Sequence, residues 1–151
     1  MAYQEVEILL VEDDPSDEEL TLHALRRDKL INRIHLARDG EEALDFLFCR
    51  NVHAHRSFLS PPRVVLLDLK LPKVDGLQVR EQVKSDPRTK SIPVVILTSS
   101  KEEKDRMNGY QLGANSYIQK PVDFEKFRET VKQLGVYWLI VNEPPPAEAH
   151  R

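Results

Sequence analysis

Residues that could carry out chemistry stand directly after apolar segments of this sequence. The segments have the length of β-strands, and charged or hydroxyl-bearing side chains follow four of them. These residues are, in chain order, Glu12, Asp13, Asp14, Asp68, Thr98 and Lys120. A carboxylate such as Asp68, at the end of the run "VVLLD", is costly to place in apolar surroundings unless its charge has a use.

The aspartates of this set could bind a metal ion. If the first and third strands are neighbours, their ends lie about 4.8 Å apart, and Asp13, Asp14 and Asp68 would share one small pocket. Carboxylates so close together raise one another's pKa values, and a hard divalent cation such as Mg²⁺ relieves that repulsion. A second interpretation is local, because Asp14-Pro15-Ser16 is also a good start for a helix, with the aspartate as its cap.

The apolar segments alternate with stretches of helix length five times along the chain. The expected strands are Val6–Val11, Arg33–Ala37, Arg63–Asp68, Ile92–Ser100 and Asn115–Pro121, and the last helix begins near Asp123. Strands that are apolar at nearly every position are typical of a parallel sheet covered by helices on both faces. The sequence therefore predicts a doubly wound α/β domain, with ligands bound at the carboxyl ends of its strands.

Size and composition narrow the function classes. A chain of 151 residues with 31% charged and 40% hydrophobic residues is expected to form one soluble domain. We assign it residues 1–141, and the proline-rich tail 142–151 is predicted to be disordered. The net charge of −3 argues against a nucleic-acid surface, and no apolar run is long enough for a membrane helix. The single cysteine, Cys49, fits a reducing cytoplasm.

The complete set of motifs resembles the receiver domain of two-component response regulators. The resemblance covers about residues 6–134 and includes features at the predicted end of each strand except the second. They are the acidic pair Asp13-Asp14, Asp68 followed by Pro72 and Asp75-Gly76, Thr98 closing "VVILT", and Lys120-Pro121 after "GANSYIQ". The resemblance implies a flavodoxin-like (βα)5 receiver fold, in which a parallel sheet has the strand order 2-1-3-4-5.

The resemblance also implies how the site would work. Asp68 would accept a phosphoryl group from a phosphohistidine of a sensor histidine kinase, which is a known nucleophilic chemistry of carboxylates. Asp13, Asp14 and Asp68 would bind Mg²⁺ together with the backbone carbonyl of Lys70. Glu12 would point away from the metal or contact it through water.

Three further residues take roles from the same resemblance. Lys120 would supply a cation, and Thr98 a hydroxyl, to the oxygens of the phosphoryl group. Tyr117 would be the switch aromatic that moves when Thr98 is drawn toward the phosphoryl group. The bond between Lys120 and Pro121 would be cis, and intrinsic dephosphorylation would end the signal.

The chain leaves little room for an output domain after Val141. The signal would therefore pass on through a protein–protein contact, a phosphorelay step or a change of oligomeric state. The last helix carries a continuous apolar stripe, made up of Phe124, Phe127, Val131, Leu134 and Trp138. We expect its first part to pack on the sheet, and its extension "VYWLIV" to pair with a second copy in a homodimer.

Several narrower interpretations remain open at this stage. The single-domain form and "SYIQKPVDFEKF" are similar to regulators paired with bacterial phytochrome kinases. The rival enzyme class, an aspartate-nucleophile phosphatase of haloacid-dehalogenase type, would need a D-x-D-x-[TV] motif, and Pro15 and Ser16 break that pattern. We expect His35 to be a packed strand residue, and His53 and His55 to be solvated residues of the polar loop Cys49–Arg63.

Overall fold

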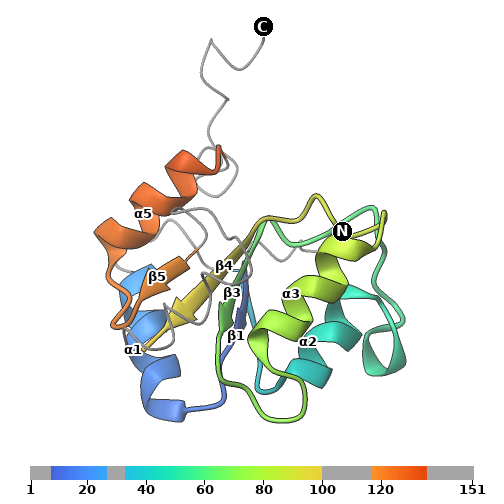
Figure 1. Ribbon diagram of the computed structural model, residues 1–151, viewed down its shortest axis with the longest axis horizontal. Helices are drawn as coiled ribbons and strands as arrows, with labels where there is room; N and C mark the ends of the chain where they lie inside the picture. The colour runs from blue at the N-terminus through green and yellow to red at the C-terminus, as the bar shows by residue number, and fades with distance from the viewer. Residues whose placement is uncertain (1–7, 27–32, 100–116, 136–151) are drawn as a thin grey trace, which may run out of the picture.

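The computed structural model describes residues 8–26, 33–99 and 117–135 (Figure 1). Three of the predicted segments fall largely or wholly outside these residues. They are the helical stretch after Ser100, the extension "VYWLIV" and the tail 142–151.

The five described strands form one parallel sheet in the order β2-β1-β3-β4-β5, which confirms the predicted topology. The strands are β1 (Ile8–Val11), β2 (Ile34–Ala37), β3 (Val64–Asp68), β4 (Val94–Thr98) and β5 (Tyr117–Gln119). Every residue of β1, β3 and β4 is buried, as expected for central strands covered on both faces.

An aspartate caps the start of each described α-helix. The helices are α1 (Pro15–Leu25), α2 (Gly40–Leu47), α3 (Gly76–Ser85) and α5 (Phe124–Gln133). The side chain of each cap accepts a hydrogen bond from a backbone N–H of the first turn, and the caps are Asp14, Asp39, Asp75 and Asp123. These caps explain why α1 begins at Pro15 and α5 directly after Asp123, as the sequence predicts.

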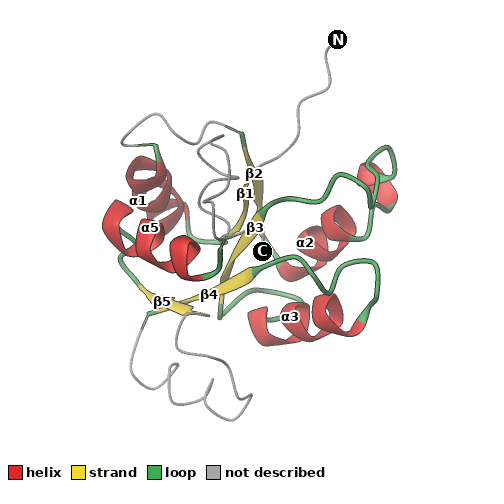
Figure 2. Cartoon of the chain, turned by 90° about the horizontal axis from the view of Figure 1, so that it is seen from above, coloured by secondary structure: helices red, strands yellow, loops and turns green. Residues whose placement is uncertain are grey.

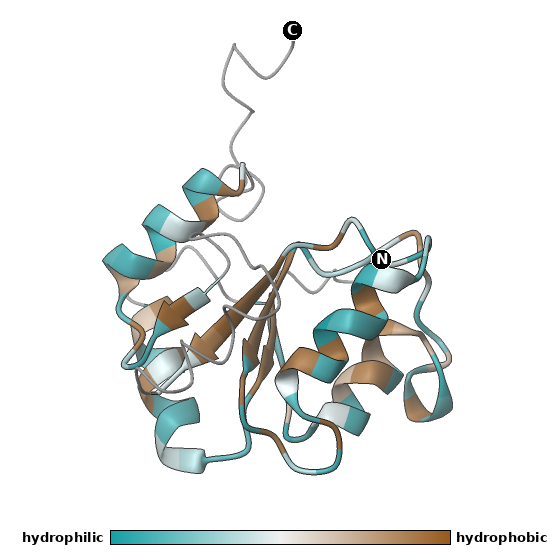
Figure 3. Ribbon diagram, in the orientation of Figure 1, coloured by the Kyte–Doolittle hydropathy of each residue, from teal (hydrophilic) through white to brown (hydrophobic). Residues whose placement is uncertain are grey.

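The helices cover the sheet in two layers, with α2 and α3 on one face and α1 and α5 on the other (Figure 2). Alternate residues of the central strands feed the two cores. Leu9, Val65 and Leu67 pack in the core beneath α2 and α3, whereas Leu10 and Leu66 pack beneath α1 and α5. The strands are accordingly the most hydrophobic part of the ribbon (Figure 3). Within the described ranges, no helix is both long and apolar enough to cross a membrane.

The last helix uses the first part of its apolar stripe inside the domain. Phe124, Phe127 and Val131 are buried, and the latter two pack in the core beneath α1 and α5, with Leu134 packed against that core from its edge. This confirms the expectation that the start of the stripe covers the sheet. Trp138 lies outside the described residues.

The loop between α2 and β3, which we predicted only as a polar connection, contains ordered structure. It contains a short 3-10 helix, η1 (Asn51–His53), and Arg56 lies 3.7 Å above the ring of Phe46. Arg56 also donates hydrogen bonds to the carbonyls of Phe46 and Ser60. These contacts fasten the middle of the loop to α2.

The two histidine expectations have different outcomes. His35 is packed as expected, because it stacks on Phe46 with ring centroids 4.3 Å apart. His53 differs from the solvated residue that we expected, since its ring lies edge-on to both His35 and Phe46, at 5.2 and 5.1 Å. His55 is exposed, as expected. The loop folds back over α2, and this long-range packing cannot be read from the loop sequence.

Candidate functional site

Polar residues from four strands meet at the carboxyl edge of the sheet. Because β1 and β3 are paired in register up to their ends, Glu12 comes next to Asp68. On the far side, the backbone N–H of Lys120 donates a 2.6 Å hydrogen bond to the carbonyl of Thr98. The peptide bond between Lys120 and Pro121 is cis. The sheet thus brings together residues that lie far apart in the sequence.

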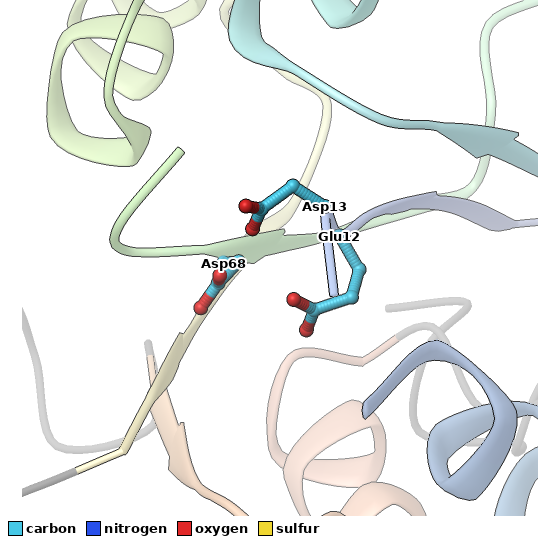
Figure 4. A group of neighbouring side chains, drawn as sticks. All are labelled: Glu12, Asp13 and Asp68. Atoms are coloured by element: carbon cyan, nitrogen blue, oxygen red, sulfur yellow. The ribbon is translucent and has the colours of Figure 1, made fainter. Parts of the chain in front are cut away.

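An acidic cluster forms the centre of the site. Glu12, Asp13 and Asp68 each offer a carboxylate oxygen, and these oxygens lie within 4.8 Å of one another (Figure 4). Glu12 and Asp68 are buried, with 1% and 6% of their surfaces exposed, whereas Asp13 is open to solvent. The three side chains thus offer a cation carboxylate oxygens, and one of them is accessible from the solvent.

The structure assigns Asp14 a different place from the one we expected. Its carboxylate accepts a 2.9 Å hydrogen bond from the backbone N–H of Ser16 and caps α1. Glu12, which was expected to point away, occupies the position beside Asp68 instead. The reason is that β1 ends at Val11, so the first carboxylate after the strand, and not the third, lies beside the end of β3. The local helix-cap interpretation of Asp14 is therefore the one the structure supports.

The Lys120 ammonium is surrounded by three carboxylates. Its Nζ lies 2.7 Å from Glu12 Oε1, 2.9 Å from Asp17 Oδ2 and 3.1 Å from Asp68 Oδ1. Burial lowers the pKa of Lys120, but the hydrogen bonds and charges of these carboxylates outweigh burial and raise it. Lys120 is therefore a permanent cation at neutral pH.

Burial acts in the opposite direction on the acids. Burial raises the pKa of Glu12 to about 7, although the hydrogen bond from Lys120 works against that shift. The pKa of Asp68 is also raised, by burial first, and the positive charge of Lys120 opposes the increase. Lys120 thus partly offsets the effect of burial and favours the ionised form of both carboxylates.

The other expected residues lie around this centre. Thr98 is fully buried, and within the described part of the chain its hydroxyl has no hydrogen-bond partner. Tyr117 is half-buried and packs against the core beneath α2 and α3. Lys70 is exposed, two residues beyond Asp68. An unpartnered buried hydroxyl carries a cost, and that cost is removed if an incoming group supplies an acceptor.

The contact between Asp17 and Lys120 belongs to the site and was not predicted from the sequence. Asp17 stands in the first turn of α1, three residues after the Asp14 cap, and the first turn faces the same edge of the sheet as the strand ends. The signal that could have revealed it is this position, because the helix that follows β1 must begin at the site.

This arrangement can support two kinds of chemistry. Oxygen donors from Glu12, Asp13 and Asp68 are the ligands that Mg²⁺ prefers, so the donor set fits that ion. A buried carboxylate beside a fixed cation can also act as a nucleophile toward an anionic electrophile, because the cation offsets the incoming negative charge.

Comparisons with known proteins agree with the fold. Residues 8–132 match the family model described as the response regulator receiver domain. The chain is 43% identical over 138 residues to the probable methanogenesis regulatory protein FilR2 of Methanothrix harundinacea, and this match covers 91% of this chain and 86% of FilR2. It is 36% identical over 133 residues to response regulator Rcp1 of Synechocystis sp., covering 87% of this chain and 88% of Rcp1.

Solved structures give the same result. The structure of the bacteriophytochrome response regulator AtBRR superposes with a TM-score of 0.81 at 51% identity, covering 89% of this chain and 96% of AtBRR. The Mn²⁺-bound form of Rcp1 superposes with a TM-score of 0.69 at 33% identity, covering 95% of this chain and all of that structure.

Proposed function

This chain belongs to the response regulator receiver family of two-component systems, and on that basis we propose that it is a phosphorylatable switch with Asp68 as the phosphoryl acceptor. One observation carries the proposal. The buried carboxylate of Asp68 lies 3.1 Å from the Lys120 ammonium and beside the carboxylates of Glu12 and Asp13.

The proposed reaction transfers a phosphoryl group from a phosphohistidine of a sensor histidine kinase. A carboxylate oxygen of Asp68 attacks the phosphorus, a new O–P bond forms, and the N–P bond to the imidazole breaks. The imidazole leaves and takes up a proton from water. The phosphorylated state ends by hydrolysis, a separate step in which water attacks the same phosphorus, the O–P bond to Asp68 breaks, and inorganic phosphate leaves.

We propose that Glu12, Asp13 and Asp68 bind Mg²⁺, with the backbone carbonyl of Lys70 as a further ligand. This set replaces Asp14 with Glu12. When bound, Mg²⁺ would offset negative charge on the transferred group. The all-oxygen donor set supports the assignment, as does the relative Rcp1, for which a Mn²⁺-bound structure has been solved.

Lys120 and Thr98 would bind the oxygens of the phosphoryl group. Lys120 is already beside Asp68, and the buried hydroxyl of Thr98 would gain an acceptor for its proton. A nearly complete switch needs about 5.5 kcal/mol of differential affinity. Two hydrogen bonds to a charged group contribute about 1.5–3 kcal/mol each, so the two together reach that value only at the top of the range.

Tyr117 would then couple the site to the surface of the domain. It stands opposite Ile96 in the pairing of β5 with β4, close to the strand end that carries Thr98. Movement of Thr98 toward the phosphoryl group would change the space beside β5, and the Tyr117 ring is the large side chain able to fill it.

The partners proposed are a kinase of bacterial phytochrome type and a second copy of the chain. The first rests on the likeness to AtBRR, a bacteriophytochrome response regulator. The second rests on the stripe of the last helix, which extends to Trp138 in the sequence. The expected output is a protein–protein contact in the cytoplasm or a step in a phosphorelay, and no specific observation favours the phosphatase alternative.

Phosphorylation is tested by intact mass spectrometry. The protein is incubated with Mg²⁺ and acetyl phosphate, and we expect an adduct of one phosphoryl group that hydroxylamine removes. The adduct should be absent in Asp68→Asn and present in Asp86→Asn, which neutralises an aspartate at the far end of α3. Absence of any adduct in the unmodified protein would refute the proposal.

The dimer is tested separately by light scattering. We expect the mass of a dimer for the unmodified protein and a shift toward the monomer for Trp138→Glu. An identical mass for the two proteins would contradict a role of the stripe in the interface.

A further inference from the structure

We propose that Asp17 is a positioning residue that competes with the Asp68 phosphoryl group for Lys120. By holding the Lys120 ammonium in the resting state, Asp17 makes phosphorylation of the site less favourable. The inference rests on the proposed function of Asp68. It concerns a carboxylate of α1 that belongs neither to the acidic cluster nor to the proposed reaction.

The donor capacity of Lys120 is the first step of the argument. An ammonium group has three N–H donors, and three carboxylate contacts surround it, from Glu12, Asp17 and Asp68. In the resting site, the contact with Asp17 is a hydrogen bond, whereas the contact with Glu12 Oε1 is an ion pair without hydrogen-bond geometry, so three carboxylates already compete for the one ammonium. A phosphoryl group on Asp68 brings new anionic oxygens beside Lys120, and these oxygens would compete with the existing carboxylates for the ammonium.

The solvent exposure of the three carboxylates decides which of them loses its contact with Lys120. Glu12 is almost fully buried, and its carboxylate would pay the full cost of losing a buried partner. The side chain of Asp17 is 37% exposed, so water can replace the ammonium as its partner. Asp17 is thus the carboxylate whose contact with Lys120 is most easily lost.

The surroundings of the ion pair allow this exchange. A cavity of about 230 Å³ opens beside it, lined by Asp17 and Thr21 from α1 and by Ser99 and Lys120 from the strand ends. A released Asp17 side chain therefore has room to turn and solvent to enter. The Asp14 cap fixes the start of α1, so the exchange requires only a side-chain rotation and not a movement of the helix.

Electrostatic repulsion between Asp17 and the phosphoryl group opposes phosphorylation, as the competition for Lys120 does. Asp17 and Asp68 approach the same Lys120 nitrogen, so a phosphoryl group on Asp68 would be repelled by a carboxylate close by. Neutralising Asp17 removes that repulsion and releases one donor of Lys120. Both effects favour the phosphorylated form.

An ordinary structural role predicts a different result. An aspartate in the first turn stabilises a helix through its favourable interaction with the helix dipole. If this were the whole role of Asp17, its neutralisation would lower the melting temperature and leave phosphorylation unchanged or weaker. An increase in phosphorylation separates the two roles.

The experiment compares Asp17→Asn, Asp17→Glu and Glu19→Gln with the unmodified protein. Glu19→Gln is the matched control, because it neutralises an exposed carboxylate of the same helix. The steady-state fraction of phosphorylated protein is measured by intact mass over a range of acetyl phosphate concentrations at constant Mg²⁺. For Asp17→Asn, we expect the concentration for half-phosphorylation to fall about fivefold, the factor that a partly exposed ion pair can supply.

The half-phosphorylation concentrations of the two controls should stay near that of the unmodified protein. Asp17→Glu keeps the negative charge at position 17, and Glu19→Gln keeps the ion pair between Asp17 and Lys120. An unchanged or higher half-phosphorylation concentration for Asp17→Asn would overturn the inference. So would an equal fall in Glu19→Gln, since a general charge effect would then be the cause.

A second measurement does not depend on phosphorylation. In the side-chain ammonium nitrogen NMR spectrum of the resting protein, the Lys120 signal is identified by its loss in Lys120→Arg. It should shift in Asp17→Asn and not in Glu19→Gln. If the unmodified protein takes up no phosphoryl group, the proposed function fails and the competition fails with it. An unshifted signal refutes the Asp17 contact by itself, even if Asp68 is phosphorylated.

Discussion

Lys120 Nζ lies 3.1 Å from Asp68 Oδ1, although Asp68 ends β3 and Lys120 follows β5, and these two strands are not neighbours in the sheet. The contact spans the end of β4, which separates β3 from β5. Lys120 therefore reaches across one strand to the centre of the site, where it offsets the charge of carboxylates that are buried together.

Replacing Lys120 should strengthen the binding of Mg²⁺ while weakening the fold. In Lys120→Gln the acidic cluster loses its nearby cation, so we expect Mg²⁺ affinity to rise about tenfold. Without Mg²⁺, stability should fall by about 3 kcal/mol, because buried carboxylates are left unpaired. Calorimetric titration and urea unfolding measure the two effects, with the exposed Lys126→Gln as control. Weaker Mg²⁺ binding in Lys120→Gln would contradict the ion-pair account.

Two variants decide which acid after β1 binds the metal. Glu12→Gln should lower Mg²⁺ affinity about tenfold or more, since a carboxylate of the cluster is neutralised. Asp14→Ala should leave Mg²⁺ affinity nearly unchanged and lower stability by about 1 kcal/mol, because it removes the cap of α1. The opposite ranking in an Mg²⁺ titration would restore Asp14 as the ligand.

Gly76 is required by a close backbone approach. A Cβ at this position would lie 2.3 Å from the carbonyl oxygen of Asp68. Gly76→Ala, a change that usually favours a helix, should therefore destabilise the protein by about 2 kcal/mol and displace the chain around Asp68. Urea unfolding measures the loss, and Gln82→Ala on the exposed side of α3 should have little effect. A stabilised Gly76→Ala variant would argue against the close approach.

Arg56 should account for much of the order in the loop between α2 and β3. Arg56→Ala removes the contact with the Phe46 ring and the hydrogen bonds to two backbone carbonyls. We expect a loss of about 2 kcal/mol in urea unfolding and faster hydrogen exchange in residues 49–62. His55→Ala, which alters an exposed residue of the same loop, serves as the control. Equal effects of the two changes would show that Arg56 does not anchor the loop.

His35 should make stability depend on pH. Burial lowers the pKa of His35, and the charges of His53 and Arg56 add to this effect, while Glu42 opposes it. The folded protein therefore favours neutral His35, whereas the unfolded chain binds a proton near pH 6.5. His35 thus reduces stability progressively as the pH falls from about 7 through 6.5 toward its lowered folded pKa.

This dependence is measured by comparing variants across the pH range. The stability difference between the unmodified protein and His35→Phe should shift in favour of the variant as the pH is lowered. His23→Phe, at an exposed position of α1, should show no such trend. A pH-independent difference for His35→Phe would contradict a buried, neutral His35.

Much of the fold could be predicted because its signals are local. The apolar runs of β1, β3 and β4 bury every residue, and an aspartate caps each described α-helix close to where the sequence indicates a start. Strand length, helix period and capping depend on neighbours within a few residues. The strand order, in contrast, came from the resemblance to a family.

The sequence by itself identified the chemistry of the site, because acids, a hydroxyl and an amine at the ends of parallel strands must meet at one edge of the sheet. Only the tertiary structure decided which side chains touch. Glu12, not Asp14, lies beside Asp68 because β1 ends at Val11 and its register with β3 sets the next residue at the site. Asp17 reaches Lys120 for a similar reason, since α1 and β5 meet only through the packing of the sheet and its helices. Register and packing are long-range properties, and three consecutive carboxylates in a sequence do not reveal which of them points inward.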